Sequence, residues 1–162
     1  MELYKYDFAY IFMKSHNRTR FIVTDLPVDG ACVVEYGTEA AIKAGVELIE
    51  PMSCIAEKSP TGVKVYVAEP NLTIKSSYLA KKDTEIIYKQ TLTCLQAIQK
   101  QYNYITDIVI NIDGKVCLEP VSHVIQSVLH DFSCVFRSVV ICCPNAEVKS
   151  LYVSAFNIMN RM

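Results

Sequence analysis

The sequence predicts a three-layer α/β/α domain with a mixed, mostly parallel central sheet. Apolar runs at 21–25 (FIVTD), 107–112 (DIVINI) and 135–143 (VFRSVVICC) have the continuous hydrophobicity of strands that are buried on both faces. Segments with helical periodicity follow the second and third of these runs. Strands come first and then alternate strictly with helices over short connections, which is typical of this fold class.

The remaining strands are expected in the first half of the chain. Residues 3–13 place aromatic side chains at alternate positions, the period of a strand with one covered face. Residues 31–37 are expected to pair again, and residues 62–70 carry valines at alternate positions until Pro70 ends the strand. The segment between them, residues 51–61, is expected to be a loop.

Four helices are expected. Good helix formers occupy residues 38–50, with Thr38 as the N-cap, and apolar residues recur near helical spacing over 83–102 and 120–132. Pro144 and Asn145 are expected to break the chain and to cap the last helix. That helix carries one apolar stripe, formed by Val148, Leu151, Tyr152, Ala155, Phe156 and Met159.

The composition indicates one globular domain over residues 1–162. The chain is 51% hydrophobic and 20% charged, and its formal charge of -1 provides no overall field toward nucleic acid or an anionic membrane. No stretch approaches the roughly 20 apolar residues that span a bilayer, so we expect a cytoplasmic protein without membrane insertion. The seven cysteines are odd in number and lack C-x-x-C spacing, which predicts reduced thiols in the core.

The residues that could carry chemistry form no strong catalytic or metal-binding motif. His123 and His130 are seven residues apart, about 10 Å along a helix, which is too far for both to bind one metal ion. Cys117 before His123 has the residue types of a nucleophile and its base, with Asp113 or Asp131 as a third member. A small apolar role for Cys117 in a partly buried turn explains it better. We therefore expect no catalytic residue, metal or cofactor.

Residues 111–117 (NIDGKVC) are the candidate for contact with an anion. Gly114 and Lys115 lie between a buried strand and the start of a helix, where backbone amides can meet a phosphate. A simple turn is the alternative, and it is favoured: Gly114 then supplies a positive φ and Lys115 points into water.

Six segments follow one another in a characteristic order: FIVTDLP (21–27), EYGTEAAIKAG (35–45), VKVYVAEPNL (63–72), DIVINIDGKV (107–116), PVSHVIQSVL (120–129) and VVICCPNAEV (139–148). This order resembles that of a macrodomain over nearly the whole chain. Macrodomains typically bind ADP-ribose, and some hydrolyse ADP-ribose from proteins. The nearest resemblance is to the macro and macro-like modules in the large multidomain replicase subunit of coronaviruses and their relatives.

The resemblance is weakest in the loops that would hold the ligand. The family has an asparagine that holds the distal ribose, and this chain has Thr24 and Asp25 in the matching stretch. The family's glycine triplet is reduced here to Gly37, and Glu35 adds a negative charge beside it. The last loop keeps only one of two glycines, so larger side chains obstruct an anion. If ADP-ribose binds, the resemblance implies a pocket lined by Thr24, Asp25, Gly37, Thr38, Asp113, Gly114, Lys115 and Val116.

Two classes of function follow, and we rank the first above the second. The first is a binding module without hydrolase activity that interacts with a protein or single-stranded RNA in a larger assembly. RNA would meet Lys81, Lys82 and Lys89 and stack on Tyr78 and Tyr88, although a solvated helix start with packed tyrosines explains the same stretch. The second is an ADP-ribose-binding macrodomain or ADP-ribosyl hydrolase with divergent loops. A purely structural domain is the third alternative.

Overall fold

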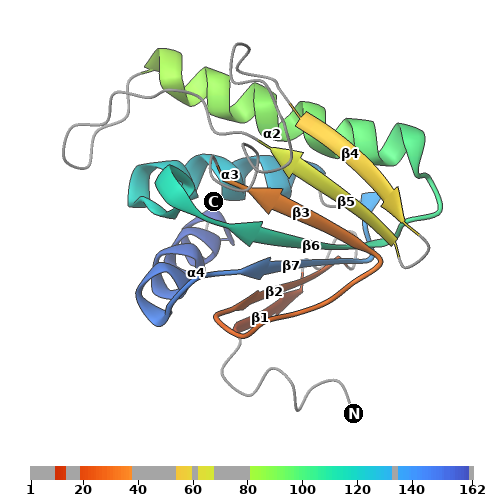
Figure 1. Ribbon diagram of the computed structural model, residues 1–162. Coiled ribbons are helices and arrows are strands. Elements are labelled where there is room, and N and C mark those ends of the chain that lie inside the picture. The colour runs from red at the N-terminus through yellow and green to blue at the C-terminus, as the bar shows by residue number, and fades with distance from the viewer. Residues whose placement is uncertain are drawn as a thin grey trace.

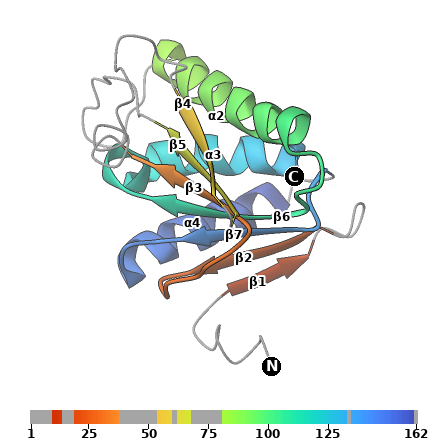
Figure 2. The ribbon, with the colours of Figure 1, turned by 45° about the vertical axis from the view of Figure 1, so that its right-hand side comes forward.

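The chain forms a twisted sheet with helices packed against it (Figures 1 and 2). The computed structural model describes residues 10–13, 19–37, 54–59, 62–67, 81–132 and 135–160. Within these ranges seven strands pair in the order β1-β2-β7-β6-β3-β5-β4. Their bounds are β1 Tyr10–Met13, β2 Arg20–Thr24, β3 Cys32–Tyr36, β4 Cys54–Ser59, β5 Gly62–Val67, β6 Asp107–Ile112 and β7 Ser138–Cys142.

The five inner strands run parallel, and the two edge strands run antiparallel to their neighbours. Strand β7 lies between β2 and β6, and β3 lies between β6 and β5, all in parallel register. Strand β1 pairs antiparallel with β2, and β4 pairs antiparallel with β5. The apolar runs β6 and β7 occupy the centre because only continuous hydrophobic strands can be buried on both faces. The predicted mixed, mostly parallel sheet is confirmed.

Three α-helices of the described chain lie side by side on one face of the sheet (Figure 1). They are α2 Lys81–Gln101, α3 Glu119–Phe132 and α4 Ala146–Asn160, and a short 3₁₀ helix, η2 Gly114–Cys117, precedes α3. Helices α3 and α4 follow β6 and β7, so each begins at the edge where its parallel strand ends. The Asn145 side chain caps α4 by accepting a hydrogen bond from the Val148 backbone N–H at 2.9 Å, as expected.

Both faces of the sheet are buried, as a three-layer fold requires. The helix side holds the larger core, in which Phe21 packs against Phe156 of α4 with ring centroids 4.9 Å apart. The opposite face carries a second cluster, with Val28 packed against it. The second cluster comprises Ile22, Val33, Val109, Val140 and Cys142.

The prediction of a loop over residues 51–61 is wrong, because Cys54–Ser59 forms strand β4. Its residues CIAEKS are too polar to indicate a strand by themselves. They become one by pairing with β5, where Glu57 lies opposite Lys64 and Ser59 opposite Gly62. An edge strand needs only one paired side and one covered face, so weak local signals suffice once the neighbouring strand is in place. The helix expected over residues 38–50 lies outside the described residues.

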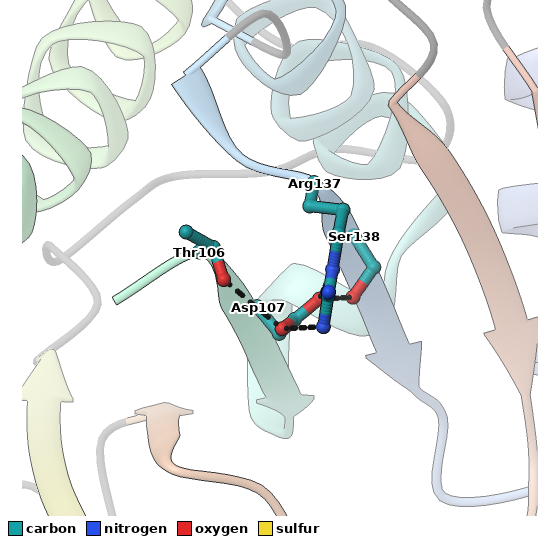
Figure 3. Close-up of polar contacts among 4 residues, drawn as sticks. All are labelled: Thr106, Asp107, Arg137 and Ser138. Atoms are coloured by element: carbon teal, nitrogen blue, oxygen red, sulfur yellow. Dashed lines mark hydrogen bonds and ion pairs between the residues drawn. The ribbon is translucent and has the colours of Figure 1, made fainter. Parts of the chain in front are cut away.

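At the amino edge of the sheet, a polar cluster ties β6 to β7 (Figure 3). The Asp107 carboxylate accepts hydrogen bonds from Arg137 Nε at 3.2 Å and Nη2 at 2.6 Å, and from Ser138 Oγ at 2.6 Å. The Thr106 hydroxyl donates a further bond at 3.2 Å. Burial works to raise the pKa of Asp107, but the bonds from Arg137 and Ser138 and the guanidinium charge outweigh it and hold that pKa below its usual value of 3.8.

Replacing Asp107 by Asn should reduce the free energy of unfolding at pH 7 by about 1 kcal/mol, because the ion pair is partly exposed to solvent. A carboxylate with a lowered folded-state pKa stabilises the protein fully above its unfolded pKa, and this contribution is lost as the pH falls through the folded one. The stability difference between wild type and Asp107→Asn, measured by urea unfolding, should therefore shrink between about pH 5 and pH 2. Asp29→Asn, in an exposed loop, is the control; a pH-independent difference at position 107 would contradict the assignment.

Candidate functional site

A pocket of about 370 Å³ opens at the carboxyl edge of the sheet. Its volume is within the range of pockets that hold small molecules. Crevices beyond the carboxyl ends of parallel strands are the usual ligand sites of open α/β sheets. The pocket lies where β2, β3, β6 and β7 end, and it is lined by Asp25, Leu26, Pro27, Glu35, Asn111, Ile112, Cys142, Cys143 and Pro144.

Strand register brings four polar or sulfur-bearing residues into one row beside this pocket. Thr24 pairs with Cys142, Cys142 with Asn111, and Asn111 with Glu35, across β2, β7, β6 and β3. Two residues earlier, the same four strands carry the apolar row of the second cluster. Because side chains alternate between the two faces of a sheet, residues two positions apart share a face. The polar row therefore lies on the same face as the apolar row, at the end nearer the pocket.

Glu35 and Asn111 are joined directly within this row. Asn111 Nδ2 donates a hydrogen bond to Glu35 Oε1 at 2.9 Å, and both side chains are half-buried. Val33 and Val109, two residues earlier on the same face, are buried, so Glu35 and Asn111 lie next to packed apolar side chains. The bond orients the Glu35 carboxylate and leaves acceptor capacity on both residues for a further partner.

Asp25 enters the pocket wall because a tight turn follows β2. The Thr24 hydroxyl accepts a hydrogen bond from the Leu26 N–H at 3.0 Å, and the Thr24 carbonyl accepts one from the Cys143 N–H at 2.7 Å. The buried Asp25 Oδ1 has no hydrogen-bond partner among the described residues, since Lys149 Nζ is 4.0 Å away. The Asp25 side chain is 26% exposed at the pocket. A buried carboxylate oxygen that has an ion pair but no hydrogen bond calls for a functional explanation.

The two pocket cysteines are neutral thiols at pH 7. Burial raises the pKa of Cys142 to about 11, and burial followed by nearby groups including Cys117 raises that of Cys143 to about 12. A protonated thiol is a poor nucleophile and a poor metal ligand. No disulfide joins any two of the five described cysteines, which are Cys32, Cys94, Cys117, Cys142 and Cys143.

Gly37 brings the loops after β3 and β6 together. A Cβ at Gly37 would lie 3.0 Å from Asp113 Cβ and 3.1 Å from the Asp113 carbonyl oxygen. The Asp113 N–H also donates to the Tyr36 carbonyl at 2.9 Å. Tyr36 is itself held beneath helix α2, where its hydroxyl donates to Gln90 Oε1 at 2.9 Å. The close approach that requires glycine is therefore one between two loops of the protein.

The loop after β6 is held from below by helix α4. The Tyr152 side chain is fully buried, and its hydroxyl donates to the Val116 carbonyl at 2.7 Å. Val116 itself points into the core, whereas Asp113 and Gly114 are exposed. Gly114 has φ of +72°, which L side chains adopt only at a cost. The expected role of Gly114 in a turn is confirmed by this angle.

One residue of the ligand set derived from the macrodomain resemblance, Asp25, lines the pocket. Thr24 is fully buried, and Thr38 lies outside the described residues. The sequence interpretation treated Glu35 only as an unfavourable charge, included Asn111 only as the first residue of a candidate anion loop, and gave the pocket cysteines no role at the site. The signal that finds them is the register of four strands, which no local pattern contains.

The lysines proposed for RNA are exposed on α2: Lys81, Lys82 and Lys89 all face solvent. Tyr88 between them is partly buried: its hydroxyl donates to Asp131 Oδ2 at 2.8 Å, and its ring packs against the core. Tyr78 lies outside the described residues. The packed-tyrosine explanation thus fits the described part of this stretch better than base stacking.

Within the described ranges, no group of three or more His, Cys, Asp or Glu is arranged to hold a metal ion. His123 Nε2 lies 4.0 Å from Glu119 Oε1 on α3, where His123 is partly exposed and Glu119 is exposed. None of the described helices has the length and hydrophobicity that crossing a bilayer requires.

Comparison with known proteins shows which solved structures share this architecture. No protein-family model matches the chain, and no curated protein matches its sequence. Solved structures do match. An Oceanobacillus iheyensis macrodomain mutant solved with ADPR is 11% identical, with a TM-score of 0.69 over 94% of this chain and 100% of that one.

Two further structures give the same result. The Trypanosoma brucei macrodomain in complex with ADP is 11% identical, with a TM-score of 0.56 over 83% of this chain and 68% of that one. The macro domain of ganglioside induced differentiation associated protein 2 is 10% identical, with a TM-score of 0.60 over 93% and 89%. The chain therefore has the three-layer α/β/α fold of a macrodomain, as the resemblance implied.

Replacing Gly37 by Val should lower the free energy of unfolding by about 1–3 kcal/mol, because the new side chain collides with Asp113. Adding Asp113→Gly should restore part of this loss, since it removes the nearest atom. Thermal and urea unfolding of the single and double variants measure the effect. An unchanged stability of Gly37→Val would show that the two loops are not packed as described.

Proposed function

We propose that the carboxyl-edge pocket binds a nucleotide of the ADP-ribose type, with its nucleoside in the pocket and its phosphates at the rim. The observation that carries the proposal is Asp25, a carboxylate at the pocket wall whose buried oxygen has no hydrogen bond within the described chain. An amino group of a nucleobase supplies the N–H donor that such a carboxylate lacks. Leu26, Pro27 and Ile112 offer apolar surface for the flat face of the base.

The charge distribution favours phosphates outside the pocket. The described residues of its lining include two carboxylates, Asp25 and Glu35, and no Lys or Arg. Helices α3 and α4 begin at the same edge, so their amino ends direct partial positive charge toward the rim. Lys115 lies on the loop that leads into α3 and adds a cation there. The macrodomains with the same fold that were solved with ADPR and ADP support a ligand of this class.

The proposal is one of binding without hydrolysis. The pocket thiols are protonated at neutral pH, and no histidine is among the described residues that line the pocket. Asp25 and Glu35 have the residue types of an acid and a base, but Asp25 already has a binding role in the proposed complex, and Glu35 is bonded to Asn111. Binding to a protein or to single-stranded RNA stays a prediction from the sequence, and the engagement of Tyr88 makes it the second choice.

Isothermal titration of the purified protein with ADP-ribose tests the proposal, and we expect saturable binding. Asp25→Asn keeps the shape of the side chain but replaces a charged acceptor, so it should weaken binding roughly 10- to 100-fold. Asp29→Asn, four residues away on an exposed part of the same loop, should leave the affinity unchanged. Absence of heat with wild type, or equal affinities for wild type and Asp25→Asn, would contradict the proposal.

Replacing Gly114 by Val tests whether the phosphates lie over the loop after β6. Valine at a φ of +72° strains the loop and adds bulk at its exposed tip, so ADP-ribose binding should be lost while adenosine binding is kept. Titration with both ligands, alongside thermal unfolding to confirm the fold, measures this. Equal losses for the two ligands would place the phosphates elsewhere.

A further inference from the structure

In the polar row beside the pocket, Asn111 and Glu35 form a hydrogen bond in which the donor and the acceptor are known. Asn111 donates its amide N–H to Glu35 Oε1, and this fixes which atoms remain for a ligand. The second Glu35 oxygen and Asn111 Oδ1 both accept hydrogen bonds. This end of the pocket is therefore suited to O–H or N–H donors.

Its charge makes this end unsuited to an anion. Asp25 and Glu35 are the two carboxylates among the described residues that line the pocket, and this described lining holds no Lys or Arg. Lys149 of α4 lies 4.0 Å from Asp25, at the other end of the row from Glu35. A phosphate beside Glu35 would therefore meet a like charge and no compensating cation among the described lining residues.

The two carboxylates lie at opposite ends of the same pocket. Asp25 directly follows β2, and Glu35 lies on β3, three strand spacings away, which separates their backbones by about 14 Å. The bond to Asn111 of β6 turns the Glu35 carboxylate toward the strands that lie between it and Asp25. A nucleoside whose base meets Asp25 would extend its ribose along the pocket toward Glu35 and Asn111.

We propose that Glu35, oriented by Asn111, determines sugar specificity: it accepts the hydroxyl protons of the ribose next to the base and excludes a phosphate on that sugar. This inference rests on the proposed nucleotide binding. The pocket would then take ADP-ribose and reject ADP-ribose 2′-phosphate, and the rejection would reside in one carboxylate. Carboxylates that bind a ribose 2′-hydroxyl discriminate against the 2′-phosphate in other nucleotide sites by the same physics.

The experiment compares ADP-ribose with ADP-ribose 2′-phosphate by isothermal titration. Wild type should bind the 2′-phosphate at least about tenfold more weakly, a modest factor because the half-exposed carboxylate is partly screened. Glu35→Gln keeps the size of the side chain and an acceptor oxygen but loses the charge, so its two affinities should agree within about threefold. Glu85→Gln, on the exposed side of α2, is the matched control and should keep the wild-type ratio.

The possible outcomes separate this inference from the proposed function. If wild type binds ADP-ribose and its 2′-phosphate equally, or Glu35→Gln keeps the wild-type ratio, the role of Glu35 is wrong and nucleotide binding stands. If wild type binds neither ligand, both proposals fail. Titration of 2′-deoxyadenosine diphosphate against ADP adds a second arm, since loss of the hydroxyl should weaken binding to wild type more than to Glu35→Ala.

Discussion

The register of the four strands β2, β7, β6 and β3 is the constraint on which the rest of this structure depends. It aligns an apolar row, in which Val33, Val109 and Val140 are neighbours, and so buries the second face of the sheet. Two residues further on, it aligns the row that includes Asn111 and Glu35. A shift of one residue in any strand would turn these side chains to the other face. The same strand register therefore determines both the second core cluster and the residues that line the pocket.

The two edges of the sheet differ in how completely their polar groups are satisfied. At the amino edge, the Asp107 carboxylate accepts hydrogen bonds from three neighbouring side chains, those of Thr106, Arg137 and Ser138. At the carboxyl edge, the buried Asp25 Oδ1 has no hydrogen bond and is reached by Lys149 only as an ion pair at 4.0 Å. A satisfied cluster adds stability and offers nothing to a ligand, whereas an unsatisfied carboxylate costs stability and is available for binding.

The likeness to solved macrodomains is one of fold and not of sequence. At 10–11% identity the TM-scores are 0.56–0.69, so the likeness extends to the fold alone. Local contacts such as the close approach of Gly37 to Asp113 belong to this chain's own loops. One fold can host many sites, so the ligand has to be argued from the pocket's own residues.

The sequence by itself determined the secondary structure wherever hydrophobic pattern is local: the apolar strands β6 and β7, helix α2 and the cap at Asn145 all follow from it. Only the tertiary structure decided that 54–59 is a strand and that Asp25, Glu35 and Asn111 border one pocket. The physical reason is that periodicity reports which face of an element is buried, whereas strand order and register arise from pairing between distant segments.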